Sequence, residues 1–329
     1  MKRMAVKSSR IVVLSLSVFL FGAFVLAHSE KREPTTVEQF DKWMEEFSNW
    51  GRWGVDDELG AANLITDVKR QEASELVKTG TTVSLAHDFI TEESADAAEP
   101  YVLQMRVSQE AQNSMDRLDV DFHGTTFSHL DALCHVFYKD KTYNGFNFTD
   151  VATKDGCLRM GTTALSNGLV TRAILVDIPR LKGLDYLEPG TKVYQEDIEA
   201  WEKKVGVISG SGDALLLRTG RWIRREEHGP TLKMSGWDAS VIPFLAERDI
   251  ALLGAESVHE APESVPGLGF NPIHRFAIVA RGINLLDNLD LDAAADLAAR
   301  LNRWEFMLVV APIRVSGGTG SPVNPIAIF

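Results

Sequence analysis

The chain has 329 residues, of which 45% are hydrophobic and 24% charged, and its formal net charge is −12 at neutral pH. This composition is ordinary for a globular protein with a sizeable buried core. An acidic chain without a basic stripe repels phosphate backbones, which argues against nucleic acid as a partner. Two cysteines are too few for a disulfide framework. We interpret Cys134 as a small buried hydrophobe, and a disulfide between Cys134 and Cys157 remains the alternative.

The first 27 residues differ from the rest. Four cations precede a run of 17 apolar residues, from position 11 to position 27, and a polar segment follows. This order is typical of a secretory signal peptide, although the apolar run is close to the shortest that anchors a protein in a membrane. Removing residues 1–27 takes away four cations and no acids, which leaves a net charge of −16. We therefore expect an exported protein, periplasmic or secreted, with its functional domain over 28–329 and membrane contact only if the segment stays uncleaved.

Hydrophobic spacing and capping signals predict a series of helices and strands along the remainder of the chain. In chain order, we expect a helix over 37–53, a helix over 67–78, strands over 81–88 and 171–177, a helix over 195–204, a strand over 214–219, a helix over 241–248, a strand over 250–254, a helix over 291–302 and a strand over 306–312. No repeat, low-complexity tract or linker interrupts residues 35–329. The alternation of strands and helices predicts a single α/β domain.

The most informative segment runs from His123 to His135 and reads HGTTFSHLDALCH. It holds three of the eight histidines in the chain, His123, His129 and His135, together with Asp131. Imidazole nitrogens and carboxylate oxygens are the ligands that Zn²⁺ and Mn²⁺ accept. All four positions are odd, so an extended segment would place all four side chains on one face. The segment therefore predicts a metal site.

This segment resembles the signature of the cyclase-like family of metal-dependent hydrolases, which includes bacterial kynurenine formamidases and isatin hydrolases. The usual form is His-x-Gly-Thr-His-x-Asp-x-Pro-x-His. His129 and Asp131 match two of its metal ligands, and His135 matches its catalytic histidine. The first ligand is out of register, because Thr125 lies four residues before His129 and the nearest histidine is His123. The wider spacing between His123 and His129 resembles that of a longer branch of the family, so we assign His123 as the first metal ligand.

The resemblance extends over much of the chain, including residues 50–66, 212–220 and 250–256. In the family, a further histidine and an acid about a dozen residues later complete the metal site. His274 matches that histidine, and Asp287 stands where the acid is usually glutamate. The resemblance implies an α/β fold of the swivelling β/β/α type, a divalent cofactor, Zn or Mn, and a homo-oligomer.

Other candidate residues have weaker patterns. A second group of acids and one imidazole (Glu256, His259, Glu260 and Glu263) is expected to form a loop near the mouth of a pocket, with Glu256 as a candidate to hold a metal ligand in place. His87 and His228 have no companion donors, and we expect them to be structural or exposed. Five aromatic side chains are candidates to line a pocket, with core packing as the main alternative; they are Trp50, Trp53, Phe127, Phe137 and Tyr143.

The predicted metal site and the family resemblance together favour an arylformamidase-like hydrolase. A metal at this site would polarise a substrate carbonyl and lower the pKa of water, and His135 would carry the proton to the leaving amine. The expected substrate is a small aryl molecule with an amide, formamide or lactam bond, similar to N-formylkynurenine or isatin. One alternative is a metal-dependent cyclase, dehydratase or lactonase of secondary metabolism, and another is an exported metal-binding protein without catalysis. A serine hydrolase is disfavoured, because the turn at Ser211 lacks the Gly-x-Ser-x-Gly spacing.

Overall fold

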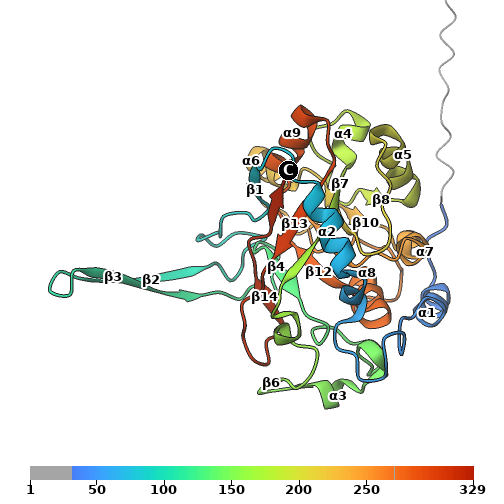
Figure 1. The fold of residues 1–329 in the computed structure, drawn as a ribbon, viewed down its shortest axis with the longest axis horizontal. Coiled ribbons are helices and arrows are strands. Elements are labelled where there is room, and N and C mark those ends of the chain that lie inside the picture. The colour runs from blue at the N-terminus through green and yellow to red at the C-terminus, as the bar shows by residue number, and fades with distance from the viewer. Residues whose placement is uncertain (1–31, 270) are drawn as a thin grey trace, which may run out of the picture. The chain divides into compact units, whose positions relative to one another are not determined.

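A mixed β-sheet forms the centre of the fold in the computed structural model, which describes residues 32–269 and 271–329 (Figure 1). Within these described residues the sheet has nine strands. In sheet order they are β1 (Thr82–Ser84), β15 (Ile326–Ile328), β13 (Glu305–Val310), β7 (Leu169–Asp177), β9 (Ala214–Arg218), β11 (Leu252–Ala255), β12 (Asn284–Asp287), β4 (His129–Asp131) and β14 (Gly320–Pro322). Residues 34–329 form one compact unit.

The middle of the sheet is parallel, and its edges are antiparallel. Strands β7, β9, β11 and β12 pair in parallel, whereas β13 and β4 join this block in antiparallel register. Parallel neighbours need crossover segments that cover the sheet, so these strands are buried on both faces and rich in Leu, Ile and Val. Every residue of β9 and β11 is buried. The α/β class expected from the alternation of strands and helices is thus confirmed.

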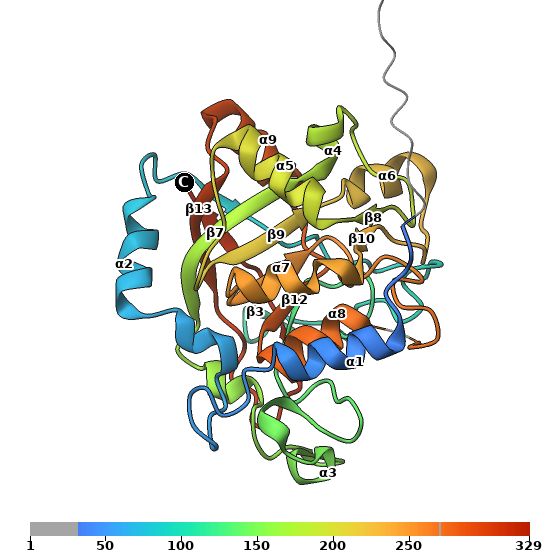
Figure 2. The same ribbon diagram turned by 90° about the vertical axis from the view of Figure 1, so that its right-hand side faces the viewer.

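Helices lie over the sheet and between its strands. They are α1 (Val37–Glu46), η1 (Gly60–Leu64), α2 (Asp67–Glu75), η2 (Tyr143–Gly145), α3 (Phe148–Val151), η3 (Thr162–Leu165), α4 (Ile178–Lys182), α5 (Gln195–Val205), α6 (Arg221–His228), η4 (Ala239–Val241), α7 (Ile242–Glu247), α8 (Pro272–His274), the π-helix η5 (Arg275–Arg281) and α9 (Asp292–Leu301). Figure 2 shows α5, α7, α8 and α1 in front of the sheet. Helix α2 contacts β7 and β13.

The first helix is shorter than its aromatic spacing predicts. It ends at Glu46, not at residue 53, because the chain beyond it bonds to the end of η5. The Asn49 backbone N–H donates to the Ala280 carbonyl at 2.9 Å, and the Asn49 side chain donates to the Arg281 carbonyl at 3.0 Å. Tertiary hydrogen bonds therefore outweigh helix continuation here. The expected helix after Thr66 is found, with the Thr66 hydroxyl capping α2.

Strands β2 (Val102–Ser108) and β3 (Asn113–Asp119) form a hairpin that the sequence prediction missed. The hairpin extends away from the central sheet, and nearly all of its residues are exposed (Figure 1). In its register Leu103 lies opposite Leu118, and Met105 and Val107 share their face. One face of the hairpin is therefore largely apolar and open to solvent. Two further short pairs complete the strands, β8 (Lys192–Val193) with β10 (Gly236–Trp237) and β5 (Ala152–Thr153) with β6 (Gly156–Cys157).

The two cysteines form a disulfide, with their Cα atoms 6.3 Å apart. Our preferred interpretation of Cys134 as a small hydrophobe was therefore wrong, although the side chain is buried as expected. Cys134 directly precedes His135, and Cys157 ends β6. The bond ties the segment after β4 to a hairpin that lies farther along the chain.

The predicted signal peptide lies outside the described residues. In the part of the chain that the structure describes, no helix has the length and apolar character needed to cross a membrane.

Candidate metal centre

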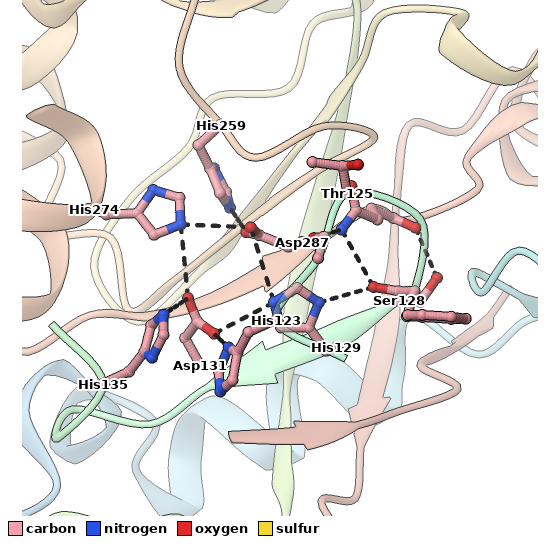
Figure 3. Close-up of polar contacts among 12 residues, drawn as sticks. His123, Thr125, Ser128, His129, Asp131, His135, His259, His274 and Asp287 are labelled. Atoms are coloured by element: carbon pink, nitrogen blue, oxygen red, sulfur yellow. Dashed lines mark hydrogen bonds and ion pairs between the residues drawn. The ribbon is translucent and has the colours of Figure 1, made fainter. Parts of the chain in front are cut away.

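The register between β4 and β12 brings the first three donor side chains together. These strands are antiparallel, and His129 lies directly opposite Asp287. Residues two apart on a strand share a face, so Asp131 points to the same side as His129, while Leu130 points into the core. His129 Nε2 lies 3.4 Å from Asp131 Oδ1 and 4.0 Å from Asp287 Oδ2. All three side chains are buried, and Figure 3 shows them facing one another.

The loops on either side of β4 supply two more histidines. The segment from His123 to His135 is not extended throughout, because only residues 129–131 pair as a strand, so the shared face does not extend to all four donors. The donors converge because the chain bends around β4. His123 Nδ1 lies 3.1 Å from Asp131 Oδ1, and His135 Nε2 lies 4.0 Å from Asp131 Oδ2. The His123 and His135 rings stack at 3.9 Å between centroids.

A glycine on β14 leaves room for the His123 ring. Gly320 pairs with Asp131 across the sheet. A Cβ at Gly320 would lie 2.8 Å from His123 Cε1 and 2.5 Å from the Leu130 carbonyl oxygen, which is too close for any other residue without movement. The His123 Nε2 atom also hydrogen-bonds with Thr319 Oγ1 at 2.9 Å. The β14 edge thus sets the orientation of this ring.

The fifth predicted metal ligand, His274, enters from α8. Its Nε2 atom lies 3.4 Å from Asp287 Oδ2 and 3.6 Å from Asp131 Oδ2, so it stands between the two carboxylates. Glu260 fixes this orientation, because its Oε1 atom accepts from both the backbone N–H and the Nδ1–H of His274 at 2.8 Å. A carboxylate behind a histidine is the usual support for a metal-binding imidazole. His129 is held in a similar way, since its Nδ1–H donates to the Phe127 carbonyl at 2.8 Å.

The spacing of these atoms fits a bound cation. Ligands at about 2.0–2.2 Å from one zinc ion lie about 3–3.5 Å apart at ordinary coordination angles. The nitrogen-to-oxygen distances at Asp131 and Asp287 lie mostly near this range. Among the described residues, both oxygens of Asp131, Oδ1 of Asp287 and Nδ1 of His123 are buried without a hydrogen-bond partner. Buried polar atoms are rarely left unpaired, so this donor set fits a divalent metal.

The electrostatics keep the two carboxylates ionised. Burial raises the pKa of Asp131, but the adjacent His123 and His129 imidazoles outweigh it and hold that pKa well below its usual value. Burial likewise opposes ionisation of Asp287, and the charge of His274 is the main influence that lowers its pKa. The ion pairs of both carboxylates are with histidines only, among the residues that the structure describes. The site therefore offers two anionic ligands at neutral pH.

His135 differs from the other histidines in its environment. The pKa of His135 is lowered to about 4, mainly by burial; Asp131 opposes this shift, and the nearby histidines add to it. Its imidazole is therefore neutral at pH 7. Its side chain is 29% exposed, whereas those of His129 and His274 are almost inaccessible. The geometry thus leaves His135 at the open side of the cluster.

His259 also lies in this site, although the sequence prediction placed it in a loop near a pocket mouth. The segment is a loop, and Glu260 and Glu263 line a pocket, as expected. The His259 side chain, however, is completely buried, and its Nε2 atom lies 3.1 Å from Asp287 Oδ1 (Figure 3). Glu260 also reaches inward, where it supports His274. Glu256 accepts backbone hydrogen bonds from Thr219 and Gly220, so it organises the start of α6. The density of histidine and acid over residues 256–263 was the sequence signal for these positions.

Thr125 lies in register with the family's first ligand, but its hydrogen bonds are with residues outside the histidine and carboxylate cluster. Its hydroxyl donates to the Asp96 carbonyl at 2.6 Å, and Arg221 donates to the Thr125 carbonyl. Asp96 in turn accepts two hydrogen bonds from Arg225, at 2.9 and 3.0 Å. Thr125 therefore belongs to a polar network that anchors the loop carrying His123.

The remaining candidates lie outside the cluster. Phe127 and Tyr143 are core residues, while Trp50 and Phe137 are 42% and 44% exposed. The exposed Phe137 ring stacks on Phe148. An aromatic ring that does contact the cluster is Phe122, which sequence analysis did not select and whose centroid lies 4.5 Å from that of His123.

The two isolated histidines are structural or exposed, as expected. His87 stacks on Trp222 with ring centroids 3.8 Å apart, and His228 is a surface residue paired with Tyr186.

Comparisons with known proteins agree with this architecture. The model of a family described as putative cyclase matches residues 62–260, which include the segment from His123 to His135 and end before His274. A crystal structure described as a novel cyclase has a TM-score of 0.79 and 27% identity, and the match covers 87% of this chain and 99% of that one. Among curated proteins, none matches this chain.

Two isatin hydrolase structures share the fold at lower identity. Isatin hydrolase A from Labrenzia aggregata, bound to benzyl benzoate, has a TM-score of 0.54 and 18% identity over 78% of this chain and 94% of its own. An isatin hydrolase bound to the product analogue thioisatinate has a TM-score of 0.54 and 17% identity over 81% and 98% of the two chains.

Proposed function

Because this chain belongs to the putative cyclase family, we propose that it is a metal-dependent hydrolase that opens an amide, formamide or lactam bond in a small aryl substrate. The observation that carries the proposal is the convergence of histidine nitrogens on two buried carboxylates, three of whose oxygens lack a hydrogen-bond partner, beside a neutral, accessible His135. The expected substrates are similar to N-formylkynurenine or isatin. Support for the aryl class comes from the shared fold of the isatin hydrolases.

Five residues would hold the metal, for which we propose Zn²⁺ or Mn²⁺: His123, His129, Asp131, His274 and Asp287. Mixed imidazole and carboxylate ligands suit either ion. When bound, such an ion supplies a Lewis acid for a carbonyl oxygen and lowers the pKa of water.

His135 would act as the general base and acid. A neutral imidazole accepts a proton from the attacking water and returns it to the leaving amine. Its accessible position and the 4.0 Å between its Nε2 atom and Asp131 Oδ2 leave that nitrogen free for this transfer. Phe122, beside His123, would contact the aryl group of the substrate.

We also propose that the protein is exported and forms a homo-oligomer. The N-terminal segment and the disulfide between Cys134 and Cys157 both suit an oxidising compartment. The exposed apolar face of the β2–β3 hairpin supports association with a second copy, because an isolated two-stranded hairpin is at best marginally stable in water. N-terminal sequencing of the exported protein and light scattering of the purified protein test these two points.

The function is tested with mature protein purified without chelator. We expect stoichiometric Zn²⁺ or Mn²⁺ by elemental analysis, and turnover in a panel of aryl formamides, lactams and lactones. Absence of stoichiometric metal would contradict the proposal. Metal without any turnover would favour a metal-binding protein, and turnover restricted to lactones or to dehydration would favour the secondary-metabolism alternative.

A further inference from the structure

Asn288 connects β12 to the chain that enters β4. It follows Asp287 directly at the end of β12, and it is completely buried. Its backbone φ is 54°, in the left-handed region that asparagine adopts more readily than most residues other than glycine. The Ser128 hydroxyl, just before β4, donates to the Asn288 carbonyl at 2.7 Å. The backbone of Asn288 is therefore fixed against the segment that carries the first metal ligands.

The side chain of Asn288 bonds to the loop between His123 and His129 at two points. Its Nδ2 group donates to the Gly124 carbonyl at 3.0 Å and to the Phe127 carbonyl at 3.2 Å. The first of these acceptors directly follows His123, and the second lies two residues before His129. One amide group thus holds both ends of the loop between these two predicted metal ligands.

The Phe127 carbonyl also orients the His129 ring. It accepts the Nδ1–H of that ring at 2.8 Å, and the opposite nitrogen, Nε2, faces Asp131 and Asp287. A histidine whose second nitrogen is fixed in this way presents the correct nitrogen to a metal. Because Asn288 is the second donor to the same carbonyl, it fixes the position of the shared oxygen. Asn288 therefore acts on His129 through one common acceptor.

Arg221 holds the remaining polar atom of the amide. Its guanidinium donates to Asn288 Oδ1 at 2.7 Å and to the Glu256 carbonyl at 2.9 Å, and it also donates to the Thr125 carbonyl. A carboxylate in place of the amide would have no proton for the two carbonyls of the loop. An apolar side chain would leave each of the three partners with one hydrogen bond fewer. The contacts at this position therefore select asparagine.

From these contacts we infer that Asn288 is a positioning residue, which fixes the loop that carries His123 and the ring orientation of His129. The inference rests on the proposed function, because these two histidines are proposed ligands of its metal. Residues that orient a metal-binding imidazole from behind typically contribute about 10- to 100-fold in metal affinity. Loss of the Asn288 side chain should therefore weaken metal binding although every ligand is still present.

Glycine at position 288 gives a specific test, because it adopts the left-handed region without strain and removes only the side-chain hydrogen bonds. Asn302→Gly is the matched control, since Asn302 has a φ of 49° and lies exposed at the end of α9. Both substitutions change the entropy of the unfolded chain in the same way.

Chelator-treated mature protein is titrated with Zn²⁺ by calorimetry. We expect Asn288→Gly to bind about 10- to 100-fold more weakly than the wild type, and Asn302→Gly to bind with wild-type affinity. Equal affinities of Asn288→Gly and the wild type would overturn the role of Asn288 and leave the proposed function intact. Absence of Zn²⁺ binding by the wild type would instead contradict the proposed function.

A second measurement needs neither metal nor activity and separates positioning from a general loss of structure. Nuclear magnetic resonance of chelator-treated protein with ¹⁵N-labelled histidine detects the ring N–H groups. In Asn288→Gly we expect the Nδ1–H signal of His129 to broaden through exchange with water. The Nδ1–H signal of His274 should persist, because that proton is bonded to Glu260. Loss of both signals would indicate general unfolding, and an unchanged His129 signal would show that the ring does not depend on Asn288; either result would overturn the inference.

Discussion

The site has two sides that are built in different ways. The Asp131 side takes its donors from one segment of thirteen residues around a three-residue strand. The Asp287 side takes them from the loop after β11, from α8 and from the end of β12. The first side is therefore visible as a sequence pattern, whereas the second exists only after the parallel strands and their crossovers have formed. Substitutions on each side test how far this difference extends to metal binding and catalysis.

The largest expected effect is on metal binding and catalysis when either of the two carboxylates is replaced. Asp131 lies within 4.0 Å of four histidine nitrogens, and Asp287 lies within 4.0 Å of three. We expect Asp131→Asn to lose its bound metal and at least about a thousandfold in kcat/KM, equivalent to about 4 kcal/mol. Asp287→Asn, which removes fewer contacts, should retain more of the metal. Elemental analysis and steady-state kinetics measure both properties, and equal metal loss in the two variants would remove the distinction.

A smaller effect is expected at His135, which lies on the Asp131 side but is assigned no metal. Removing a general acid and base costs about 10²–10⁴ in rate. We expect His135→Ala to lose turnover to this extent while it keeps the wild-type metal content. A variant that instead loses metal would show that His135 is a ligand.

The assignment of the first ligand is tested by a matched pair. His123→Ala should weaken metal binding at least about tenfold, because it removes a donor 3.1 Å from Asp131. Thr125→Val keeps the side-chain shape but removes the hydroxyl that donates to the Asp96 carbonyl, so its metal affinity should be unchanged. Calorimetric titration compares the two, and the opposite result would place the first ligand at Thr125.

The smallest effect concerns the network that anchors the loop of His123. Burial raises the pKa of Asp96, but hydrogen bonds from Arg225 and the charge of Arg221 outweigh it and lower that pKa below 3.8. A carboxyl with a lowered pKa stabilises the fold above its unfolded pKa, and this contribution is lost as pH falls through the folded value. Asp96→Asn should therefore cost about 1.5–3 kcal/mol in free energy of unfolding at neutral pH.

Urea unfolding of Asp96→Asn and wild type across pH checks this sign. The difference in free energy should stay constant down to about pH 4 and shrink below it. A difference that grows on acidification would show that the carboxylate does not stabilise this loop.

Several elements could be predicted from sequence because their signal is local. The spacing of His129 and Asp131, the cap at Thr66 and the apolar runs of β7, β9 and β13 all depend on neighbouring residues. The first strand of the β2–β3 hairpin, which the prediction missed, also has a local signal, because Leu103, Met105 and Val107 alternate with polar residues.

Other features depend on contacts between distant segments. Asp287 faces His129 only through the register of two strands far apart in the chain, and the resemblance, not the pattern, identified it in advance. His259 reaches the site through a left-handed backbone conformation that residue spacing does not report. The helix predicted over 37–53 ends earlier than expected for the same reason, because Asn49 hydrogen-bonds to residues 280 and 281.

The disulfide between Cys134 and Cys157 acts on the unfolded chain as well as on the folded one. It joins residues 23 positions apart, and closing a ring of this size lowers the conformational entropy of the unfolded state by an amount equivalent to about 3.5 kcal/mol at 25 °C. Because the ring begins at Cys134, directly before His135, the oxidised chain keeps His135 close to Cys157 even when the sheet has come apart.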